Sequence, residues 1–231
     1  MLKVILFDID NTLLSFDEYV KESMKNGFKK FGIGEYKDEM FNTFTEVNTG
    51  LWHALEKGDI SFAELKKKRW NMVFEHLNIT ADGEAFEKYF RECLFDNAIP
   101  IDGAMDLLDY LRNKYTLCVA SNGPYLQQLN RLKICGMYPY FSDYFISEEI
   151  GSQKPSISFF QTCIDRLNSK SNEQILPSEI MIIGDSLTSD MAGGIQIGMQ
   201  TCFFNPCRKP ISGEMNLNYQ VTSLKEIKSI L

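Results

Sequence analysis

The chain has 231 residues, of which 44% are hydrophobic and 24% are charged. This length and composition predict one large folded domain or a core domain with a smaller insertion, and they exclude a disordered or fibrous architecture. The formal net charge of −7 disfavours nucleic acid and anionic membranes as partners, although a local basic pocket for a small phosphate is compatible with it.

The chain opens on a strand pattern, with no basic and apolar regions of a signal peptide. No stretch has the length and apolar character of a membrane span. We therefore expect a cytoplasmic protein. The sequence does not determine its oligomeric state and is compatible with a monomer or a homodimer. The six cysteines form no CxxC pair, which predicts reduced and mostly buried thiols. His53 and His76 lie far apart without partners at ligand spacing, which argues against a zinc site or a histidine-based triad.

The first strand ends in an acidic turn. The apolar run Leu2–Phe7 leads into Asp8, Ile9 and Asp10, so both carboxylates can face one cleft at the carboxyl end of the strand. Burying two carboxylates costs several kcal/mol unless a cation compensates, so this pair predicts a metal site. Read alone, the same residues are equally compatible with a solvated Asx turn.

A helical pattern then extends from residue 15 to residue 98. The expected helices run from a cap at Ser15 or Asp17 to Phe31, and over Glu35–Leu55, Ser61–Leu77 and Asp82–Leu94. Ser61 and Glu64 form a predicted capping box. The basic run Lys66–Arg69 is interpreted as a solvated helix face, with the alternative that one of its members reaches the cleft. An all-helical block at this position predicts a separate domain over 15–98, inserted into a core of 1–14 and 99–231.

From Ile99 onward, helix and strand patterns alternate at short intervals. The expected helices are Asp102–Asn113, Pro124–Cys135, Pro155–Leu167, Thr188–Ile197 and Leu224–Leu231. The expected strands are Tyr115–Ala120, Tyr144–Ser147, Glu179–Ile183 and Gln200–Phe204. Such alternation implies right-handed parallel crossovers, so the predicted fold class is α/β, a doubly wound parallel sheet with an inserted all-α domain.

Polar signatures close three of the strands and open one helix. They are Asp8–Asp10, Ser121–Gly123, Gly184–Asp190, and Lys154 before Pro155. Because the carboxyl ends of parallel strands meet at one edge of a sheet, these side chains can converge on one cleft. Each signature alone has an ordinary alternative, such as a turn at Ser121–Gly123 or a solvated lysine before a helix-opening proline at Lys154.

Together, the four signatures resemble the motifs of the haloacid dehalogenase superfamily of aspartate-nucleophile phosphatases. The segment Asp8–Thr12 is similar to the first motif, Ser121 to the second, Lys154 to the third, and Gly184–Asp185 with Asp190 to the fourth. Their order over nearly the whole chain is far more specific than any one of them. The helical block is similar to the mobile helical cap of that superfamily.

The resemblance implies hydrolysis in two displacements. Asp8 would be the nucleophile that forms an aspartyl-phosphate. Asp10 would protonate the leaving oxygen and later deprotonate water. Members that displace halide resemble this chain but lack that acid, so the second aspartate favours phosphoryl transfer.

The resemblance also implies a metal ion and a phosphate site. Mg²⁺, or Mn²⁺, and Lys154 would oppose the charge of the phosphate. The implied metal ligands are Asp8, the backbone carbonyl of Asp10, and Asp185, oriented by Asp190. The residues expected to bind the phosphate are Thr12, Ser121, Asn122 through its amide, Lys154, and the backbone N–H groups after Asp8.

The cap would select the substrate, because the core motifs recognise only phosphate. A finer resemblance, to the YjjG group of 5′-nucleotidases that act on nucleoside monophosphates, rests on Asp10–Leu13, Asn48 with Trp52, Glu56–Ile60, Arg69 with Trp70, and Gly184–Asp190. The two cap tryptophans are interpreted as core residues rather than base-stacking ones. The alternatives are a sugar-phosphate or phosphoglycolate phosphatase or phosphomutase, a phosphonate hydrolase with a cap lysine, and a phosphometabolite-binding module without turnover.

Overall fold

The computed structural model describes residues 1–211 and 215–231 and divides the chain into two compact units. The core unit comprises Met1–Ser15 and Ala98–Leu231, and the helical unit comprises Phe16–Asn97. The chain leaves and re-enters the core unit at one point, where Leu14 and Pro100 form an antiparallel bridge. The helical unit is therefore an insertion directly after the first strand.

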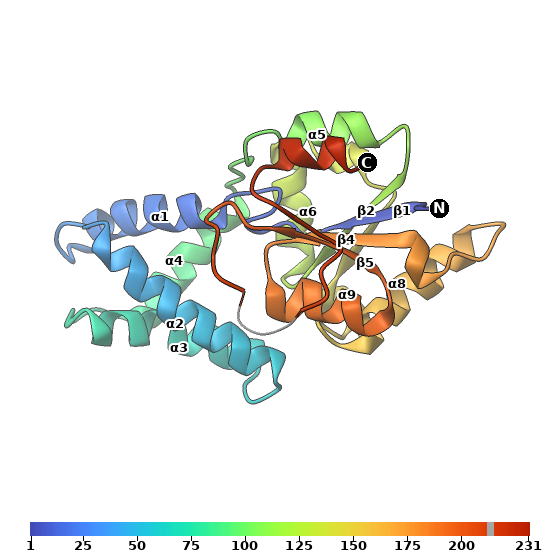
Figure 1. Ribbon diagram of the computed structural model, residues 1–231. Helices are drawn as coiled ribbons and strands as arrows, with labels where there is room; N and C mark the ends of the chain where they lie inside the picture. Colours follow the sequence, from blue (N-terminus) through green and yellow to red (C-terminus); the bar gives the residue numbers. More distant parts are fainter. Residues whose placement is uncertain (212–214) are drawn as a thin grey trace. The chain divides into compact units, whose positions relative to one another are not determined.

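The core unit is built on a parallel sheet of six strands in the order β3-β2-β1-β4-β5-β6 (Figure 1). The strands are β1 (Val4–Phe7), β2 (Thr116–Ser121), β3 (Asp143–Ile146), β4 (Ile180–Gly184), β5 (Gln200–Phe204) and β6 (Tyr219–Val221). The predicted doubly wound parallel sheet is confirmed. The sequence reading missed β6, because this edge strand has only three residues and only Val221 is buried, which leaves no apolar run to detect.

Helices cover both faces of the sheet. The core helices are α5 (Ala104–Leu111), α6 (Tyr125–Ile134), α7 (Ser147–Ile150), α8 (Ile157–Lys170) and α9 (Ala192–Ile197). In Figure 1, α5 and α6 lie on one side of the sheet and α8 and α9 on the other. The helix predicted over Thr188–Ile197 begins instead as a π-helical turn, Leu187–Met191. The last predicted helix is a 3₁₀ helix, Leu224–Ser229, and short 3₁₀ turns also span Tyr138–Tyr140 and Pro177–Glu179.

The apolar character of β1 follows from its central position. Ile5 and Phe7 belong to the hydrophobic cluster on the α5 side, whereas Val4 and Leu6 belong to the cluster on the α8 side. Successive side chains of a strand point to opposite faces, so a strand covered on both faces is apolar at every position. All four side chains are at most 1% exposed. Such a strand is a rigid base for the residue that follows it.

The helical unit consists of α1 (Phe16–Phe31), α2 (Glu39–Glu56), α3 (Phe62–His76) and α4 (Gly83–Phe95). The predicted capping box is confirmed, because the Glu64 N–H donates to Ser61 Oγ and the Ser61 N–H donates to Glu64 Oε2 at 2.8 Å. Helix α2 starts four residues later than predicted. Residues 35–38 are not helical and connect Gly34, whose φ is +119°, to the start of α2.

Aromatic rings fill the interior of the helical unit. Trp70 is fully buried, 4.4 Å from Phe86 and 5.3 Å from Phe90 between ring centroids, so its interpretation as a core residue is confirmed. Trp52 is half-buried and lies 6.0 Å from the ring of Phe62.

The cysteines agree with the expectation of reduced thiols. All six are free, and Cys118, Cys163 and Cys202 are buried. Burial raises the pKa of Cys118 and of Cys202 to about 12, which keeps both thiols protonated. Among the described residues, no helix has both the length and the apolar character that crossing a bilayer requires.

Two glycines in the helical unit are expected to respond to substitution with opposite signs. A Cβ atom at Gly27 would lie 2.5 Å from Cζ of Phe86 and 2.8 Å from Cε1 of Tyr89, whereas a Cβ atom at Gly50 would meet nothing within 4 Å. Overpacking costs about 1–3 kcal/mol and a helical alanine gains about 1 kcal/mol over glycine. Gly27→Ala is therefore expected to lower the free energy of unfolding, and Gly50→Ala to raise it.

Denaturant unfolding followed by tryptophan fluorescence measures both changes, because both tryptophans lie in this unit. Stabilisation by Gly27→Ala would contradict the close packing of α1 against α4.

Candidate active site

The sheet brings the predicted polar residues to one edge. Asp8 directly follows β1, and its N–H donates to the carbonyl of Ile183 in β4 at 2.9 Å. Asp185 directly follows β4, and Ser121 ends β2. Strands β1 and β4 are neighbours at the point where the strand order reverses, and open α/β sheets bind their ligands in the crevice at this switch point.

Lys154 connects three of these strand ends. Its Nζ donates to Asp8 Oδ1 at 2.7 Å, to the carbonyl of Ala120 at 2.6 Å and to Asp190 Oδ1 at 2.6 Å. An ammonium group has three donors, so these contacts use all of them. The side chain of Lys154 is 2% exposed and that of Asp190 is 1% exposed, so this is a buried, charge-assisted network.

Asn122 holds the backbone of Lys154. Its Nδ2 donates to the Lys154 carbonyl, and its Oδ1 accepts from the Lys154 N–H, both at 2.9 Å. The side chain of Asn122 thus positions the lysine, a role that sequence reasoning missed. The backbone N–H of Asn122 donates to no group in the described part of the chain, and its predicted contact with phosphate stays a prediction.

The segment after β4 carries two aspartates, Asp185 and Asp190, that differ in their hydrogen bonding. Asp190 is fully buried, with Oδ1 bound to Lys154 and Oδ2 accepting from the Ser186 N–H at 3.2 Å. A Cβ atom at Gly184 would lie 2.2 Å from Asp190 Oδ2, so only glycine leaves room for this carboxylate. Asp185, in contrast, accepts no hydrogen bond from the described residues.

Burial and neighbouring charges shift the pKa values of Asp8, Asp185 and Lys154. Burial raises the pKa of Asp8 to about 7, against the influence of Lys154 and with that of Asp190 and Asp10. Burial and the charges of Asp8 and Asp190 raise the pKa of Asp185 well above its usual range. Burial by itself would lower the pKa of Lys154, but the charges of Asp190 and Asp8 outweigh it and raise that pKa.

The same carboxylates can hold a metal ion. Ligand oxygens of Asp8, Asp185 and Asp190 all lie within 4.8 Å of one another. With Asp10, four carboxylates face the two cations Lys154 and Arg131, which leaves two negative charges. An all-oxygen donor set with this excess charge, including one carboxylate without a hydrogen-bond donor, fits a hard divalent cation.

Asp10 is bound by two side chains that the sequence reading missed. Arg131 Nη1 donates to Asp10 Oδ1 at 2.7 Å, and Gln128 Nε2 donates to Asp10 Oδ2 at 2.8 Å. Gln128 Nε2 also contacts Ser121 Oγ at 2.9 Å. The only sequence signal is the spacing of residues 128 and 131, which places both on one face of α6.

The turn after Asp8 offers further donors. The N–H groups of Asn11, Thr12, Leu13 and Leu14 all donate within this turn. Those of Ile9 and Asp10 donate to no group in residues 1–211 and 215–231. The hydroxyl of Thr12 is buried and likewise has no hydrogen-bond partner among these residues. These groups have the donor chemistry that phosphate oxygens require.

In the helical unit, Arg69 is a structural residue. Its Nε and Nη2 donate to the two carboxylate oxygens of Glu87 at 3.0 and 2.6 Å, and its Nη1 donates to Asn48 Oδ1 at 3.2 Å. Arg69 is 5% exposed, so the prediction of a solvated face over Lys66–Arg69 is wrong for this residue. Helical periodicity turns the fourth residue of the run inward, where Glu87 neutralises it.

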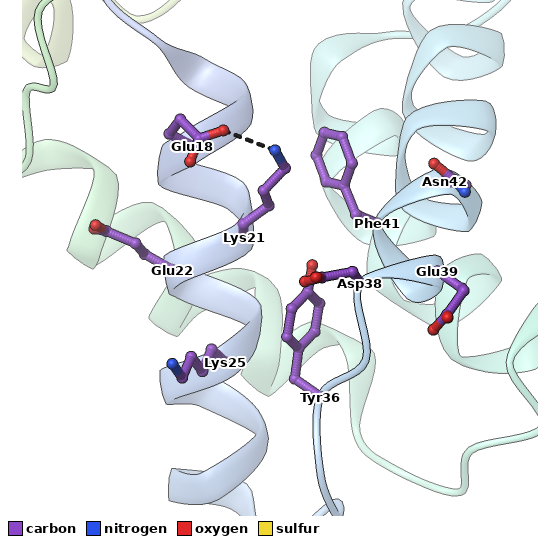
Figure 2. A pocket seen from close by; sticks show the side chains of 9 residues that line it. All are labelled: Glu18, Lys21, Glu22, Lys25, Tyr36, Asp38, Glu39, Phe41 and Asn42. Atoms are coloured by element: carbon purple, nitrogen blue, oxygen red, sulfur yellow. Dashed lines mark hydrogen bonds and ion pairs between the residues drawn. The ribbon is translucent and has the colours of Figure 1, made fainter.

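A pocket of about 680 Å³ lies within the helical unit, and Figure 2 shows its lining residues on α1 and around the start of α2. Its charged residues are Glu18, Glu22, Asp38, Glu39, Lys21 and Lys25. Lys21 is also paired with Glu18 at 2.7 Å. Four carboxylates against two lysines make this pocket unfavourable for a phosphate dianion.

The chain is similar over nearly its whole length to known hydrolases. A family model described as haloacid dehalogenase-like hydrolase matches residues 2–198. Pyrimidine 5′-nucleotidase PynA of Streptococcus pneumoniae is 33% identical over 233 residues, covering 99% of this chain and 94% of PynA. Pyrimidine 5′-nucleotidase YjjG of Escherichia coli is 27% identical over 227 residues, covering 98% and 96%.

The HAD-hydrolase YfnB of Bacillus subtilis is 34% identical over 229 residues, covering 99% of this chain and 95% of YfnB. A crystal structure of YfnB bound to magnesium matches this fold with a TM-score of 0.89, covering 100% of this chain and 98% of that one.

Removal of Lys154 is expected to destabilise the core unit strongly. Lys154→Met leaves Asp8 and Asp190 buried without their cation, and breaking a buried ion pair costs about 3–5 kcal/mol. The matched control is Lys170→Met, because Lys170 is 61% exposed and its pair with Asp143 contributes less than about 1 kcal/mol. Chemical unfolding measures both variants, and equal small losses would contradict the importance of the Lys154 network.

Proposed function

The chain belongs to the haloacid dehalogenase-like hydrolases, and from this membership we propose that it is a Mg²⁺-dependent phosphatase, acting on nucleoside 5′-monophosphates through an aspartyl-phosphate at Asp8. The observation that carries the proposal is the position of Asp8. It is 7% exposed at the switch point of the sheet, bound to Lys154 and close to the carboxylates of Asp185 and Asp190.

The two displacements use Asp8 and Asp10 in turn. An oxygen of Asp8 attacks phosphorus, and the bond from phosphorus to the ester oxygen breaks while Asp10 protonates that oxygen. Asp10 then takes a proton from a water molecule, whose oxygen attacks phosphorus. The bond from phosphorus to the Asp8 oxygen breaks, which releases inorganic phosphate and restores the Asp8 carboxylate. Asp10 follows Asp8 by two residues in the same turn, and its side chain is 31% exposed, which supports access to both water and the leaving group.

Asp8, Asp185 and the backbone carbonyl of Asp10 are the proposed ligands of the metal ion. Mg²⁺ would supply charge neutralisation for the incoming phosphate. Asp190 is the proposed orienting residue, because both of its oxygens already accept hydrogen bonds from Lys154 and Ser186.

Several donors are suited to the phosphate oxygens. The N–H groups of Ile9, Asp10 and Asn122 have no acceptor in the described part of the chain. Ser121 Oγ accepts from Gln128, and a serine hydroxyl that accepts one bond can still donate its own proton. Lys154 adds a positive charge, and the buried hydroxyl of Thr12 is a further donor. Such preorganised donors stabilise phosphoryl transfer.

The nucleotide preference rests on likeness to PynA and YjjG, which are pyrimidine 5′-nucleotidases. We propose that the core unit is the catalytic domain and that the helical unit is a cap that selects the substrate. Arg69 is bound to Glu87 and Trp70 is buried, so selection by the cap would depend on other residues than these two.

The metal assignment predicts a specific change in thermal stability. Mg²⁺ in large excess over its dissociation constant is expected to stabilise the wild-type core by about 2–3 kcal/mol, which raises Tm by several degrees for a chain of this size. Asp185→Asn should lose most of this Mg²⁺-dependent shift. Asp165→Asn, an exposed control on α8, should retain it. Equal Tm values for the wild type in Mg²⁺ and in EDTA would contradict the metal site.

The catalytic proposal predicts selective release of phosphate. With Mg²⁺, the wild type should hydrolyse nucleoside 5′-monophosphates in preference to hexose phosphates and phosphoglycolate, and Asp8→Asn should abolish this activity, because no carboxylate remains to attack phosphorus. Asp165→Asn should keep it. Preference for sugar phosphates would overturn the nucleotide assignment and keep the mechanism, whereas activity in Asp8→Asn would overturn the nucleophile.

A further inference from the structure

We propose that Arg131 and Gln128 of α6 are positioning residues that hold the carboxylate of Asp10 in the orientation for proton transfer. This inference rests on the proposed function, in which Asp10 is the acid and base. Both residues come from a helix outside the four motifs. Arg131 lies 121 positions and Gln128 118 positions after Asp10.

The two contacts fix the carboxylate at both oxygens. Arg131 Nη1 donates to Oδ1 at 2.7 Å, and Gln128 Nε2 donates to Oδ2 at 2.8 Å. One donor would leave the carboxylate free to rotate about its last bond, whereas two donors on different oxygens prevent this rotation. A carboxylate has about four lone-pair sites, so Asp10 keeps room to exchange a proton with a leaving group or with water.

The two donors also hold each other. Arg131 Nη1 donates to Gln128 Oε1 at 2.8 Å, which directs the Nε2 of Gln128 toward Asp10 and toward Ser121 Oγ at 2.9 Å. Gln128 therefore couples the position of Asp10 to that of Ser121, a proposed phosphate-binding residue. A Cβ atom at Gly123 would lie 3.1 Å from Gln128 Nε2, so the glycine leaves this amide its space.

Burial of Arg131 and Gln128 is not explained by a gain in folding stability. Arg131 and Gln128 are each 1% exposed, whereas the side chain of Asp10 is 31% exposed. Replacing a whole buried ion pair with well-packed apolar residues is often neutral or stabilising, so such a pair is weak evidence for a role in stability. The buried guanidinium of Arg131 is better explained by the proposed role of its partly exposed partner, Asp10, in proton transfer.

The test compares two leaving groups in Arg131→Met and Gln128→Leu. The sugar oxygen of uridine 5′-monophosphate needs a proton to leave, whereas 4-nitrophenolate leaves without one. The ratio kcat/KM reports only the steps up to the release of the leaving group, and dividing the values for the two substrates cancels any loss of folded enzyme.

General acid catalysis contributes about 10²–10⁴-fold, so a displaced Asp10 is expected to lower kcat/KM for the nucleotide by about 10–100-fold, and for 4-nitrophenyl phosphate by less than about threefold. Asp10→Asn sets the upper limit of this difference. Arg131→Lys should restore part of the nucleotide activity, because it keeps one charged donor. Lys133→Met, an exposed control on the same helix, should behave like the wild type.

Equal losses on both substrates, no loss, or a gain on the nucleotide would overturn the positioning role. These outcomes differ from a failure of the proposed function, in which the wild type releases phosphate from neither substrate or Asp8→Asn stays active. If the wild type prefers another alkyl phosphate, that ester replaces the nucleotide in the comparison.

Discussion

The ammonium group of Lys154 is the interaction on which the candidate active site depends. It joins Asp8 after β1, the carbonyl of Ala120 in β2 and Asp190 after β4. The sheet fixes the distances between these three positions, and Asn122 fixes the backbone of the lysine. A compact group with three donors suits this arrangement better than a planar guanidinium, whose donors lie in one fork. Asp8, the proposed nucleophile, is thereby oriented before any substrate arrives.

The hydrophobic core makes this concentration of charge possible. Four carboxylates near the end of one sheet repel one another, and Lys154 and Arg131 balance only two of them. The cluster therefore opposes folding in the absence of another cation. Directly beneath it, β1 contributes apolar side chains to the clusters on both faces of the sheet. Burial of that apolar surface is the main favourable term that offsets the repulsion.

The sequence predicted the sheet and the residues at its edge because both depend on local patterns. Strand β1 is apolar throughout, and Asp8 and Ser121 lie where a strand pattern stops. The contacts of Arg131, Gln128 and Arg69 were not predictable in this way. Each depends on a partner in another element, which lies 121 residues away for Arg131 and 118 residues away for Gln128. A charged residue in an amphipathic helix reads as solvent-facing unless its buried partner is known. The short strand β6 lacked an apolar pattern altogether.

The two units each contain a buried ion pair, and the pair in the helical unit differs from the one in the candidate active site. Arg69 and Glu87 match one positive charge with one negative charge, and both carboxylate oxygens of Glu87 accept hydrogen bonds. The charges and hydrogen bonds of that pair are balanced without a further ligand. In the core unit, Asp190 is equally well satisfied, but Asp185 has a raised pKa and no hydrogen-bond donor among the described residues. A half-buried carboxylate without such a donor, beside one that is fully hydrogen-bonded, supports the proposal that Asp185 is a ligand of the metal ion.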